Sequence, residues 1–157
     1  MTVLLVRHAR AGSRKGWEGP DIERPLSKKG KRQAEGLVDM LARYPIEGIL
    51  SSPHVRCVQT AEPLAEKLNV SIQERPELAE GAPVDGLVRL LREAATSTVV
   101  WCTHGDIVPA ALEAVADLDG VELPDDIQHP KGSFWELDQD DSGRVTKAKY
   151  FPAPEPD

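Results

Sequence analysis

The sequence predicts an α/β fold, a three-layer α/β/α sandwich with a mostly parallel central sheet and a C-terminal β-hairpin. Short β-like runs alternate with amphipathic helical runs along most of the chain, which is typical of parallel strands joined by helices. The last two β-like runs are separated only by a polar turn, which indicates a hairpin. The 157 residues suit one domain. We expect it to cover residues 1–151 and residues 152–157 to form a disordered tail.

Short apolar runs mark the strands. Thr2–Val6 and Thr98–Cys102 are the two runs most typical of buried strands, because they are short, apolar and rich in β-branched residues. The other strands are expected at Gly48–Ser51, Val70–Gln73, Ser133–Leu137 and Arg144–Phe151. The last two flank the polar run "DQDDSG" and should form the hairpin.

Four helices are expected between these strands. Ser27 is a candidate N-cap for the first, whose apolar stripe is Ala34, Leu37, Val38 and Leu41. Ser52 is a candidate N-cap for the second, with Pro53 at its first position, and Pro63 should kink or split that helix. The remaining two are expected over Val84–Ala95 and from Gly105 to about Val115. Long loops should cover residues 9–25, 74–86 and 117–131.

Composition excludes several classes of protein. Apolar residues make up 40% of the chain and charged residues 29%, as in an ordinary globular domain. No apolar run approaches the roughly 20 residues of a membrane span, and the N-terminus shows no signal peptide pattern. Two cysteines are too few for a disulfide framework, so we expect a reducing, cytoplasmic setting and no membrane partner.

Charge is distributed unevenly along the chain. Residues 1–57 carry 11 Lys and Arg against 6 Asp and Glu, whereas residues 58–157 carry 8 against 20. An acidic body with a basic N-terminal third argues against general nucleic-acid binding, which favours a basic domain with a clustered positive face. It is compatible with a local anion site.

Unusual residues follow three of the predicted strands. The first strand ends in Arg7 and His8, the second feeds a helix that carries Arg56, and the "TVVWC" strand ends in His104 and Gly105. Ligands of open α/β sheets bind at the carboxyl ends of the strands. If these strands are neighbours, two arginines, two histidines and a helix N-terminus converge, and such a group would attract a phosphate dianion.

A histidine in such a pocket can do more than bind. Neutral imidazole is a nucleophile at physiological pH, and nearby arginines should lower its pKa further. We therefore expect covalent catalysis through a phosphohistidine, with the fixed cations stabilising the phosphoryl oxygens.

The stretches "LLVRHARAG", "SSPHVRCVQTAEPLA" and "CTHGD" resemble the histidine phosphatase superfamily, also called the phosphoglycerate-mutase-like family, over nearly the whole chain. The short length and the run from Arg24 to Ala34 look like its small branch of bacterial phosphohistidine phosphatases. The chain is also similar to phosphatase domains fused behind Nudix hydrolases, which share the "KGS" at residues 131–133. No Nudix sequence is present, so a stand-alone version is expected.

The resemblance implies a role for each matching residue. His8 would accept the phosphoryl group, Arg7 and Arg56 would clamp it, and His104 with Gly105 would complete the phosphate site. The family needs no metal or cofactor for this chemistry, and we expect none here. Phosphate or sulfate should occupy the site. Lys131 and Ser133 of the "KGS" have no role that the sequence explains.

The proton donor is less clear from the sequence. Many family members carry a carboxylate in a Leu-x-Glu stretch, and "ELAEG" offers Glu80 on that pattern, with Glu77 just before it. Both could instead be solvated loop residues. Members that act on phosphohistidine can lack this acid, because protonated imidazole leaves more easily than an alkoxide.

The loop after His8 offers candidates for substrate contact. Arg14 falls where larger relatives use a polar phosphate contact, and Arg10 and Ser13 lie beside it. Arg24 could equally be a structural salt-bridge partner. Asp106 is interpreted as a helix N-terminal residue, and Cys57 and Cys102 as buried small side chains, since neither begins the Cys-x5-Arg pattern of cysteine phosphatases.

We therefore expect a metal-independent phosphatase that uses His8. Its substrate is either a protein phosphohistidine or a small phosphomonoester such as a nucleotide or sugar phosphate. Two alternatives stay open: a regulatory module that binds phosphate with little or no catalysis, and a phosphomutase, which would need a deeper closed pocket.

Overall fold

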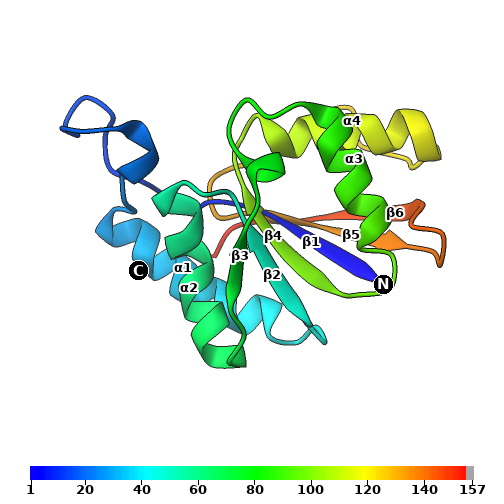
Figure 1. The fold of residues 1–157 in the computed structure, drawn as a ribbon, viewed down its shortest axis with the longest axis horizontal. Helices are drawn as coiled ribbons and strands as arrows, with labels where there is room; N and C mark the ends of the chain where they lie inside the picture. The colour runs from blue at the N-terminus through cyan, green and yellow to red at the C-terminus, as the bar shows by residue number, and fades with distance from the viewer. Residues whose placement is uncertain (155–157) are drawn as a thin grey trace.

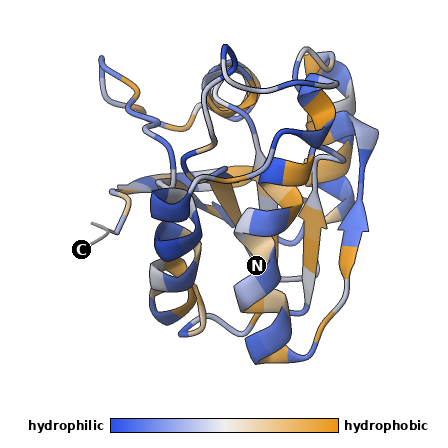
Figure 2. Cartoon of the chain, turned by 90° about the vertical axis from the view of Figure 1, so that its left-hand side faces the viewer, coloured by the Kyte–Doolittle hydropathy of each residue, from blue (hydrophilic) through white to orange (hydrophobic). Residues whose placement is uncertain are grey.

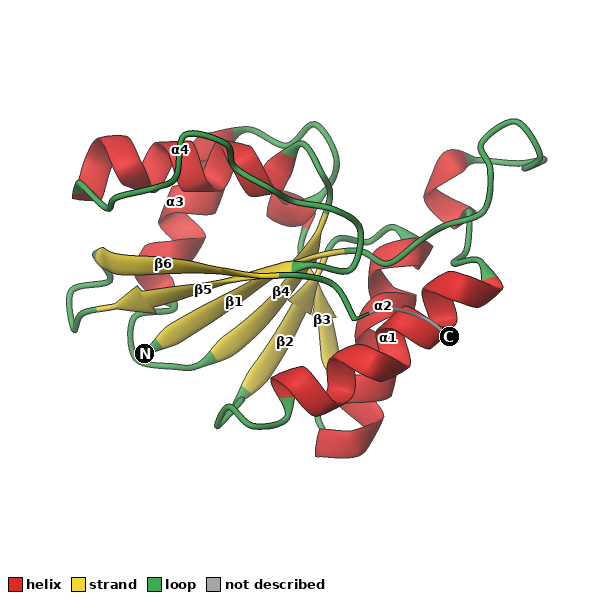
Figure 3. Cartoon of the chain, turned by 180° about the vertical axis from the view of Figure 1, so that it is seen from behind, coloured by secondary structure: helices red, strands yellow, loops and turns green. Residues whose placement is uncertain are grey.

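The computed structural model describes residues 1–154 and shows one six-stranded sheet between two pairs of helices (Figures 1 and 3). The strands are β1 (Thr2–Arg7), β2 (Gly48–Ser51), β3 (Ile72–Glu74), β4 (Val99–Thr103), β5 (Phe134–Gln139) and β6 (Val145–Phe151). The helices are α1 (Lys28–Leu41), α2 (Val55–Leu68), α3 (Val84–Glu93) and α4 (Ile107–Asp119). Short 3-10 turns cover Asp21–Glu23 and Pro76–Leu78.

The order of strands across the sheet is β3-β2-β4-β1-β5-β6. β3, β2, β4 and β1 are parallel to one another, whereas β5 pairs antiparallel with both β1 and β6. This confirms the predicted α/β sandwich with a mostly parallel sheet and a C-terminal hairpin. Among the described residues, no helix is both long and apolar enough to cross a membrane.

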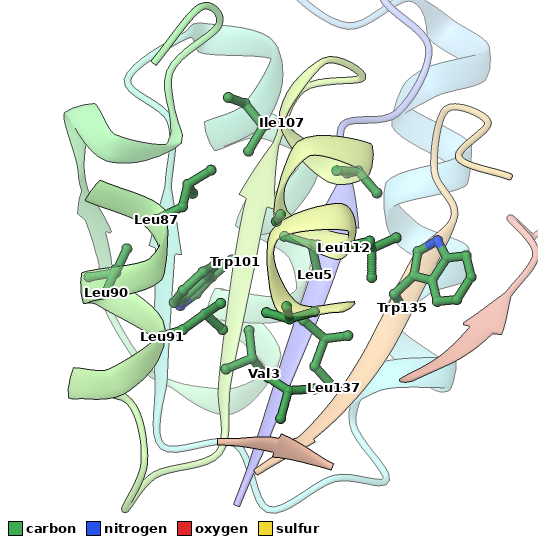
Figure 4. Close-up of a cluster of buried hydrophobic side chains, with 14 of the residues drawn as sticks. Val3, Leu5, Leu87, Leu90, Leu91, Trp101, Ile107, Leu112, Trp135 and Leu137 are labelled. Atoms are coloured by element: carbon green, nitrogen blue, oxygen red, sulfur yellow. The ribbon is translucent and has the colours of Figure 1, made fainter. Parts of the chain in front are cut away.

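Both faces of the sheet are buried. Val3 and Leu5 of β1 pack with Trp101 of β4 against α3 and α4, and Figure 4 shows this cluster. Leu4 and Val6 point the other way, into the cluster under α1 and α2. Because helices cover both faces, the inner strands are continuously apolar, and Figure 2 shows hydrophobic colour along them beside hydrophilic outer helix surfaces.

The two N-caps predicted from serines behave differently. Ser27 caps α1 as expected, since its side chain accepts a hydrogen bond from the Gly30 N–H at 3.1 Å. The prediction that Ser52 caps α2 is wrong, because α2 begins at Val55 and the Ser52 hydroxyl contacts His104 and His54 instead.

Pro63 does not split α2, which runs unbroken from Val55 to Leu68. A proline in a helix interior removes one backbone hydrogen bond. The buried face of the helix, which includes Ala61, Leu64 and Ala65, packs in the core under the sheet and keeps the helix intact across that gap.

The chain differs from expectation at two further places. α4 extends to Asp119 rather than Val115, because the Asp119 carboxylate is buried and accepts hydrogen bonds from Arg92 and the Val145 N–H. In the predicted tail, residues 152–154 form no helix or strand, and Pro154 lies close to Gly36 of α1. The rest of the tail lies outside the described residues, so its disorder stays a prediction.

Candidate active site

The carboxyl ends of β2, β4 and β1, three neighbours in the sheet, meet at one edge. A cavity of about 450 Å³ opens there. It is lined by residues from the ends of β1 and β4, from the loop after β1, from the start of α2, from the loop before α3 and from the segment before β5. The cationic and imidazole side chains of the lining include Arg7, His8, Arg14, Arg56, His104 and Lys131.

His8 follows directly after β1 and is only 5% exposed. Its backbone N–H bonds to the Thr103 carbonyl at 2.9 Å, which fixes the end of β1 to the end of β4. Its ring Nδ1 lies 2.7 Å from the Ala9 carbonyl oxygen. A carbonyl only accepts hydrogen bonds, so Nδ1 carries the proton, and in the neutral ring Nε2 holds the free lone pair.

The environment of His8 favours that neutral ring. Burial lowers its pKa from 6.5 to about 4, and the positive charges of Arg56, Arg7 and Lys131 act in the same direction, while the Ala9 hydrogen bond opposes them. The imidazole is therefore unprotonated at neutral pH.

Arg7, the last residue of β1, lies against the start of the segment that leads into α4. Its Nη1 donates to the His129 carbonyl oxygen at 2.9 Å. Its guanidinium packs on the Cα of Gly105, where an added Cβ would stand 2.6 Å from the Arg7 Cζ. Gly105 is therefore needed because any larger residue would displace Arg7.

Arg56, in the first turn of α2, is 1% exposed and held by two acidic residues. Its Nη2 donates to Asp21 Oδ2 at 3.1 Å and to Glu80 Oε2 at 3.2 Å, and its Nη1 donates to the Asp21 carbonyl at 3.0 Å. Asp21 was not predicted as a site residue, because it lies in a loop 35 positions before Arg56. A lone acid in a charged loop carries no pattern that would reveal it.

His104 follows β4 and faces His8, with 5.5 Å between the ring centroids. Its Nε2 lies 2.8 Å from the hydroxyl of Ser52 and 3.6 Å from the Cys57 sulfur. Burial lowers its pKa to about 2, and the charges of His54, His8 and Arg56 contribute. Ser52 was missed as a site residue because its position fits a helix cap equally well.

Three buried nitrogens around the cavity have no hydrogen-bond partner among the described residues: Arg7 Nε, Arg56 Nε and His104 Nδ1. Buried polar atoms are nearly always hydrogen-bonded, so three exceptions in one place need an explanation. Two of them are guanidinium N–H donors. This arrangement is suited to an anion that accepts several hydrogen bonds at once.

The structure distinguishes between the two candidate acids. Glu80 lines the cavity, and its oxygens accept from Arg14 Nη2 at 3.3 Å and Arg56 Nη2 at 3.2 Å. Its loop is held by the Gly81 N–H, which donates to the Asp106 carboxylate at 2.8 Å. Glu77 does not line the cavity and instead pairs with Arg75 at 2.7 Å.

Only two of the three candidate substrate-binding residues line the cavity. Ser13 and Arg14 line the cavity, and the Arg14 side chain is 67% exposed. Arg10 is exposed and does not line it. Its backbone N–H donates to Gln33 and its carbonyl accepts from Ser27. The contact of Arg10 with substrate therefore stays a prediction. The backbone of Arg10 connects the loop after His8 to the start of α1.

One group of possible metal ligands lies at the cavity edge. Potential ligand atoms of Asp21, His54 and Glu80 are within 4.8 Å of one another. Both carboxylates, however, already accept hydrogen bonds from arginines, and no ion is needed to balance them.

Comparison with known proteins identifies the family. Residues 3–85 match the histidine phosphatase superfamily, branch 1. The chain is also 37% identical, over 159 aligned residues, to an 8-oxo-(d)GTP phosphatase of Mycolicibacterium smegmatis. This chain belongs to the histidine phosphatase superfamily. The predicted resemblance to this superfamily is thereby confirmed.

Solved structures agree with this membership of the histidine phosphatases. The protein histidine phosphatase SixA in complex with tungstate has a TM-score of 0.76 at 23% identity, and the match covers 99% of this chain and 97% of SixA. A putative phosphohistidine phosphatase SixA from Agrobacterium tumefaciens has a TM-score of 0.71 at 28% identity, and the match covers 99% of this chain and 97% of that one.

The Mycolicibacterium relative is longer than this chain. The match covers 98% of the chain but 49% of the relative, so the chain spans about half the length of that curated protein. The activity named for the whole relative therefore does not transfer by alignment alone. The likeness to Nudix-fused phosphatase domains stays a prediction.

Proposed function

We propose that this chain is a metal-independent cytoplasmic phosphatase that transfers a phosphoryl group from its substrate to Nε2 of His8 and then to water. The observation that carries the proposal is the 2.7 Å contact between His8 Nδ1 and the Ala9 carbonyl. It assigns the proton to Nδ1 and leaves Nε2 with its lone pair, in a ring whose pKa is lowered to about 4.

In the first step the Nε2 lone pair attacks phosphorus, the N–P bond forms and the bond to the leaving oxygen breaks. Arg7 and Arg56, with their unpartnered Nε–H groups, hold the phosphoryl oxygens, and His104 offers its unpartnered Nδ1 beside them. In the second step water attacks phosphorus and the N–P bond breaks with its electron pair returning to Nε2. A proton of the water passes to the group that protonated the leaving oxygen, inorganic phosphate leaves, and the neutral ring is restored.

Glu80 is the proton donor in this proposal. It lines the cavity and contacts Arg56, so it lies beside the group that clamps the phosphate. When the substrate phosphate binds Arg56, the phosphate oxygens compete with the Glu80 oxygens for the N–H groups of Arg56. This competition frees the Glu80 carboxyl group to protonate the leaving oxygen. Positioned acids of this kind contribute about 10²- to 10⁴-fold in rate.

The substrate is a protein phosphohistidine or a small phosphomonoester. The names of relatives point to a protein or a nucleotide, since SixA is a protein histidine phosphatase and the Mycolicibacterium relative an 8-oxo-(d)GTP phosphatase. The exposed Arg14 at the cavity rim, with Ser13 beside it, would contact the part of the substrate beyond the phosphate. A mutase or a pure phosphate-binding module is disfavoured, because the cavity is open and contains a free nucleophilic nitrogen.

Hydrolysis of p-nitrophenyl phosphate in EDTA, by the wild type and by His8→Ala, tests the mechanism. We expect turnover by the wild type without metal and a loss of at least about 10³-fold in His8→Ala, with thermal unfolding curves showing that the variant is folded. Equal turnover by both proteins would refute the role of His8.

The role of Glu80 needs a substrate with a poor leaving group. Glu80→Gln should slow hydrolysis of glycerol phosphate by about 100-fold and that of p-nitrophenyl phosphate much less, because nitrophenolate leaves without a proton. Glu77→Gln is the matched control, since Glu77 pairs with Arg75 outside the cavity. Unchanged glycerol phosphate turnover in Glu80→Gln would remove Glu80 from the mechanism.

A further inference from the structure

The "KGS" segment, which the sequence left without a role, is attached to the end of β1 beside the nucleophile. The Gly132 N–H contacts both the Arg7 and the His8 carbonyl oxygens at 3.1 Å, and the Arg7 N–H donates to the Ser133 carbonyl at 3.0 Å. The Lys131 carbonyl accepts from the Gln33 side chain at 3.2 Å. The backbone that carries Lys131 is therefore fixed relative to His8.

This turn has a specific conformation. Gly132 has a φ of +85°, which glycine adopts readily and other residues rarely. Ser133 is buried, and its hydroxyl donates back to the Pro130 carbonyl. Both features hold the turn that places Lys131 at the cavity.

Lys131 differs from most other cations of the cavity in its pairing. Arg14, Arg24 and Arg56 each lie within 4.0 Å of a carboxylate of Asp21 or Glu80. Within residues 1–154, neither Lys131 nor Arg7 has a carboxylate that close to its charged group, and both line the cavity. Arg7 and Lys131 therefore carry the cavity charges that form no direct ion pair, and the Asp106 carboxylate acts on Arg7 only at longer range.

The ionisation of neighbouring groups agrees with this arrangement. Partial burial lowers the pKa of the Lys131 ammonium, and the charges of Arg7, Arg24, Arg10 and Arg14 lower it further. Lys131 in turn helps to lower the pKa of His8, so its charge lies within electrostatic range of the nucleophile. An anion placed between Lys131 and Arg7 would relieve this repulsion.

We propose that Lys131 forms a second anion subsite, which binds the inner phosphate of a diphosphate substrate whose terminal phosphate lies between Arg7 and Arg56. This inference rests on the proposed function and extends its substrates from phosphomonoesters to diphosphates, in which the bond that breaks is a phosphoanhydride. The cavity, at about 450 Å³, is within the range of small-molecule sites and exceeds the size of one phosphate group.

The chemistry of a diphosphate fits the site. The His8 Nε2 lone pair attacks the terminal phosphorus, and the bond to the bridging oxygen breaks with its electron pair on the departing monophosphate. Lys131 stabilises the charge that develops there, so this leaving group depends less on a proton from Glu80 than an alkoxide does. Water then hydrolyses the phosphohistidine as before.

The test compares binding of two hydrolysis-resistant anions in EDTA by calorimetry: methylphosphonate, with one phosphonate, and methylenediphosphonate, with two on one bridging carbon. The proteins are the wild type, Lys131→Met, Lys131→Arg and the control Lys147→Met. Lys147 is an exposed residue of β6 outside the cavity. Neither ligand is turned over, so the result does not depend on catalysis.

We expect the wild type and Lys147→Met to bind methylenediphosphonate more tightly than methylphosphonate. Lys131→Met should lower the affinity for methylenediphosphonate by about 10- to 100-fold and the affinity for methylphosphonate by much less. Lys131→Arg should restore most of the lost affinity for the diphosphonate. Equal weakening of both ligands, or no preference for the diphosphonate in the wild type, overturns the subsite.

A third ligand tests whether the two anionic groups of the substrate are joined directly, as in a diphosphate, or lie farther apart, as in a bisphosphate. Propane-1,3-diphosphonate holds its two anionic groups farther apart. If it binds more tightly than methylenediphosphonate through Lys131, the diphosphate assignment is wrong.

If the subsite is confirmed while His8→Ala keeps full p-nitrophenyl phosphate turnover, the proposed function fails and the subsite stands. If turnover depends on His8 and Lys131 has no effect on binding, the subsite fails and the proposed function stands.

Discussion

Individual residues of the site are packed so closely that a single methyl group should disturb them. Gly105→Ala would place a Cβ 2.6 Å from the Arg7 Cζ, with the flanking Arg7 nitrogens at 2.7 and 2.8 Å. The guanidinium must move, and misplaced phosphate clamps are costly. We expect kcat/KM for p-nitrophenyl phosphate to fall by about 10- to 100-fold with little change in Tm.

Gly48→Ala is the control for that variant. Its added Cβ would lie 3.7 Å from Val99 Cγ1, an ordinary contact, and Gly48 is remote from the cavity. Wild-type kinetics in Gly105→Ala would show that Arg7 does not need its position over residue 105.

The depressed pKa of His8 predicts a pH dependence of stability. The pKa is about 4 in the folded chain and near 6.5 in the unfolded chain, so between these values only the unfolded chain binds the proton. The free energy of unfolding should therefore fall as pH falls through 6.5. His8→Gln should reduce the loss between pH 7 and pH 5, measured by urea unfolding, by about 1 to 2 kcal/mol.

Identical pH profiles of the two proteins would contradict the buried, neutral state of His8. The comparison isolates His8, because His104, whose pKa is also lowered, is present in both proteins.

Sequence reasoning predicted that Arg7, His8 and His104 at strand ends and Arg56 at the start of a helix would converge, and the structure brings these four residues to one cavity. Position after a strand was the useful signal, because parallel neighbours share one edge. Asp21 could not be found in this way, and Ser52, although it directly follows β2, was interpreted as a helix cap. Their importance depends on contacts with Arg56 and His104 across the fold, and neither contact leaves a local pattern.

Among the elements, α1 depends on its N-terminal cap. The Ser27 hydroxyl accepts from the Gly30 N–H and donates to the Arg10 carbonyl, so it joins the helix to the loop after His8. Ser27→Ala should lower the free energy of unfolding by about 1 kcal/mol, measured by urea unfolding. Ser27→Asp keeps a hydrogen-bond acceptor at the cap and should lower the free energy of unfolding by less. Equal losses in both variants would show that the cap bond does not stabilise α1.

The strands and helices were predicted in type and order, whereas several boundaries were not. β2 was placed correctly because a short apolar run ends in the polar Ser51-Ser52-Pro53. The start of α2 was wrong because Ser52 and Pro53 form a good cap pattern, yet a tertiary contact to His104 takes the hydroxyl. Local propensity cannot anticipate such a contact.

At the scale of the whole molecule, Asp119 connects three elements that are distant in sequence. Its carboxylate accepts from Arg92 of α3 at 2.8 and 2.9 Å and from the Val145 N–H of β6 at 2.9 Å. Burial raises its pKa, but the hydrogen bonds from Arg92 and Val145 outweigh this effect and lower it overall. From the sequence we expected Asp119 to lie in an acidic loop, and nothing in that loop indicated that its carboxylate is buried.

Asp119→Ala should therefore lower the free energy of unfolding by about 2 to 3 kcal/mol in a urea titration, because it leaves Arg92 and the buried Val145 N–H without their acceptor. Asp117→Ala, at an exposed position of the same helix, should change it by less than about 0.5 kcal/mol. Equal effects of the two variants would refute a structural role for Asp119.

The most direct test of the account is to locate the phosphoryl group during turnover. The wild type is mixed with p-nitrophenyl phosphate, quenched in alkali, because phosphohistidine is acid-labile, and mapped by tandem mass spectrometry. We predict a phosphoryl group on His8 and none in His8→Ala. A phosphoryl group on another residue with His8 unmodified, or full turnover by His8→Ala, would contradict the account.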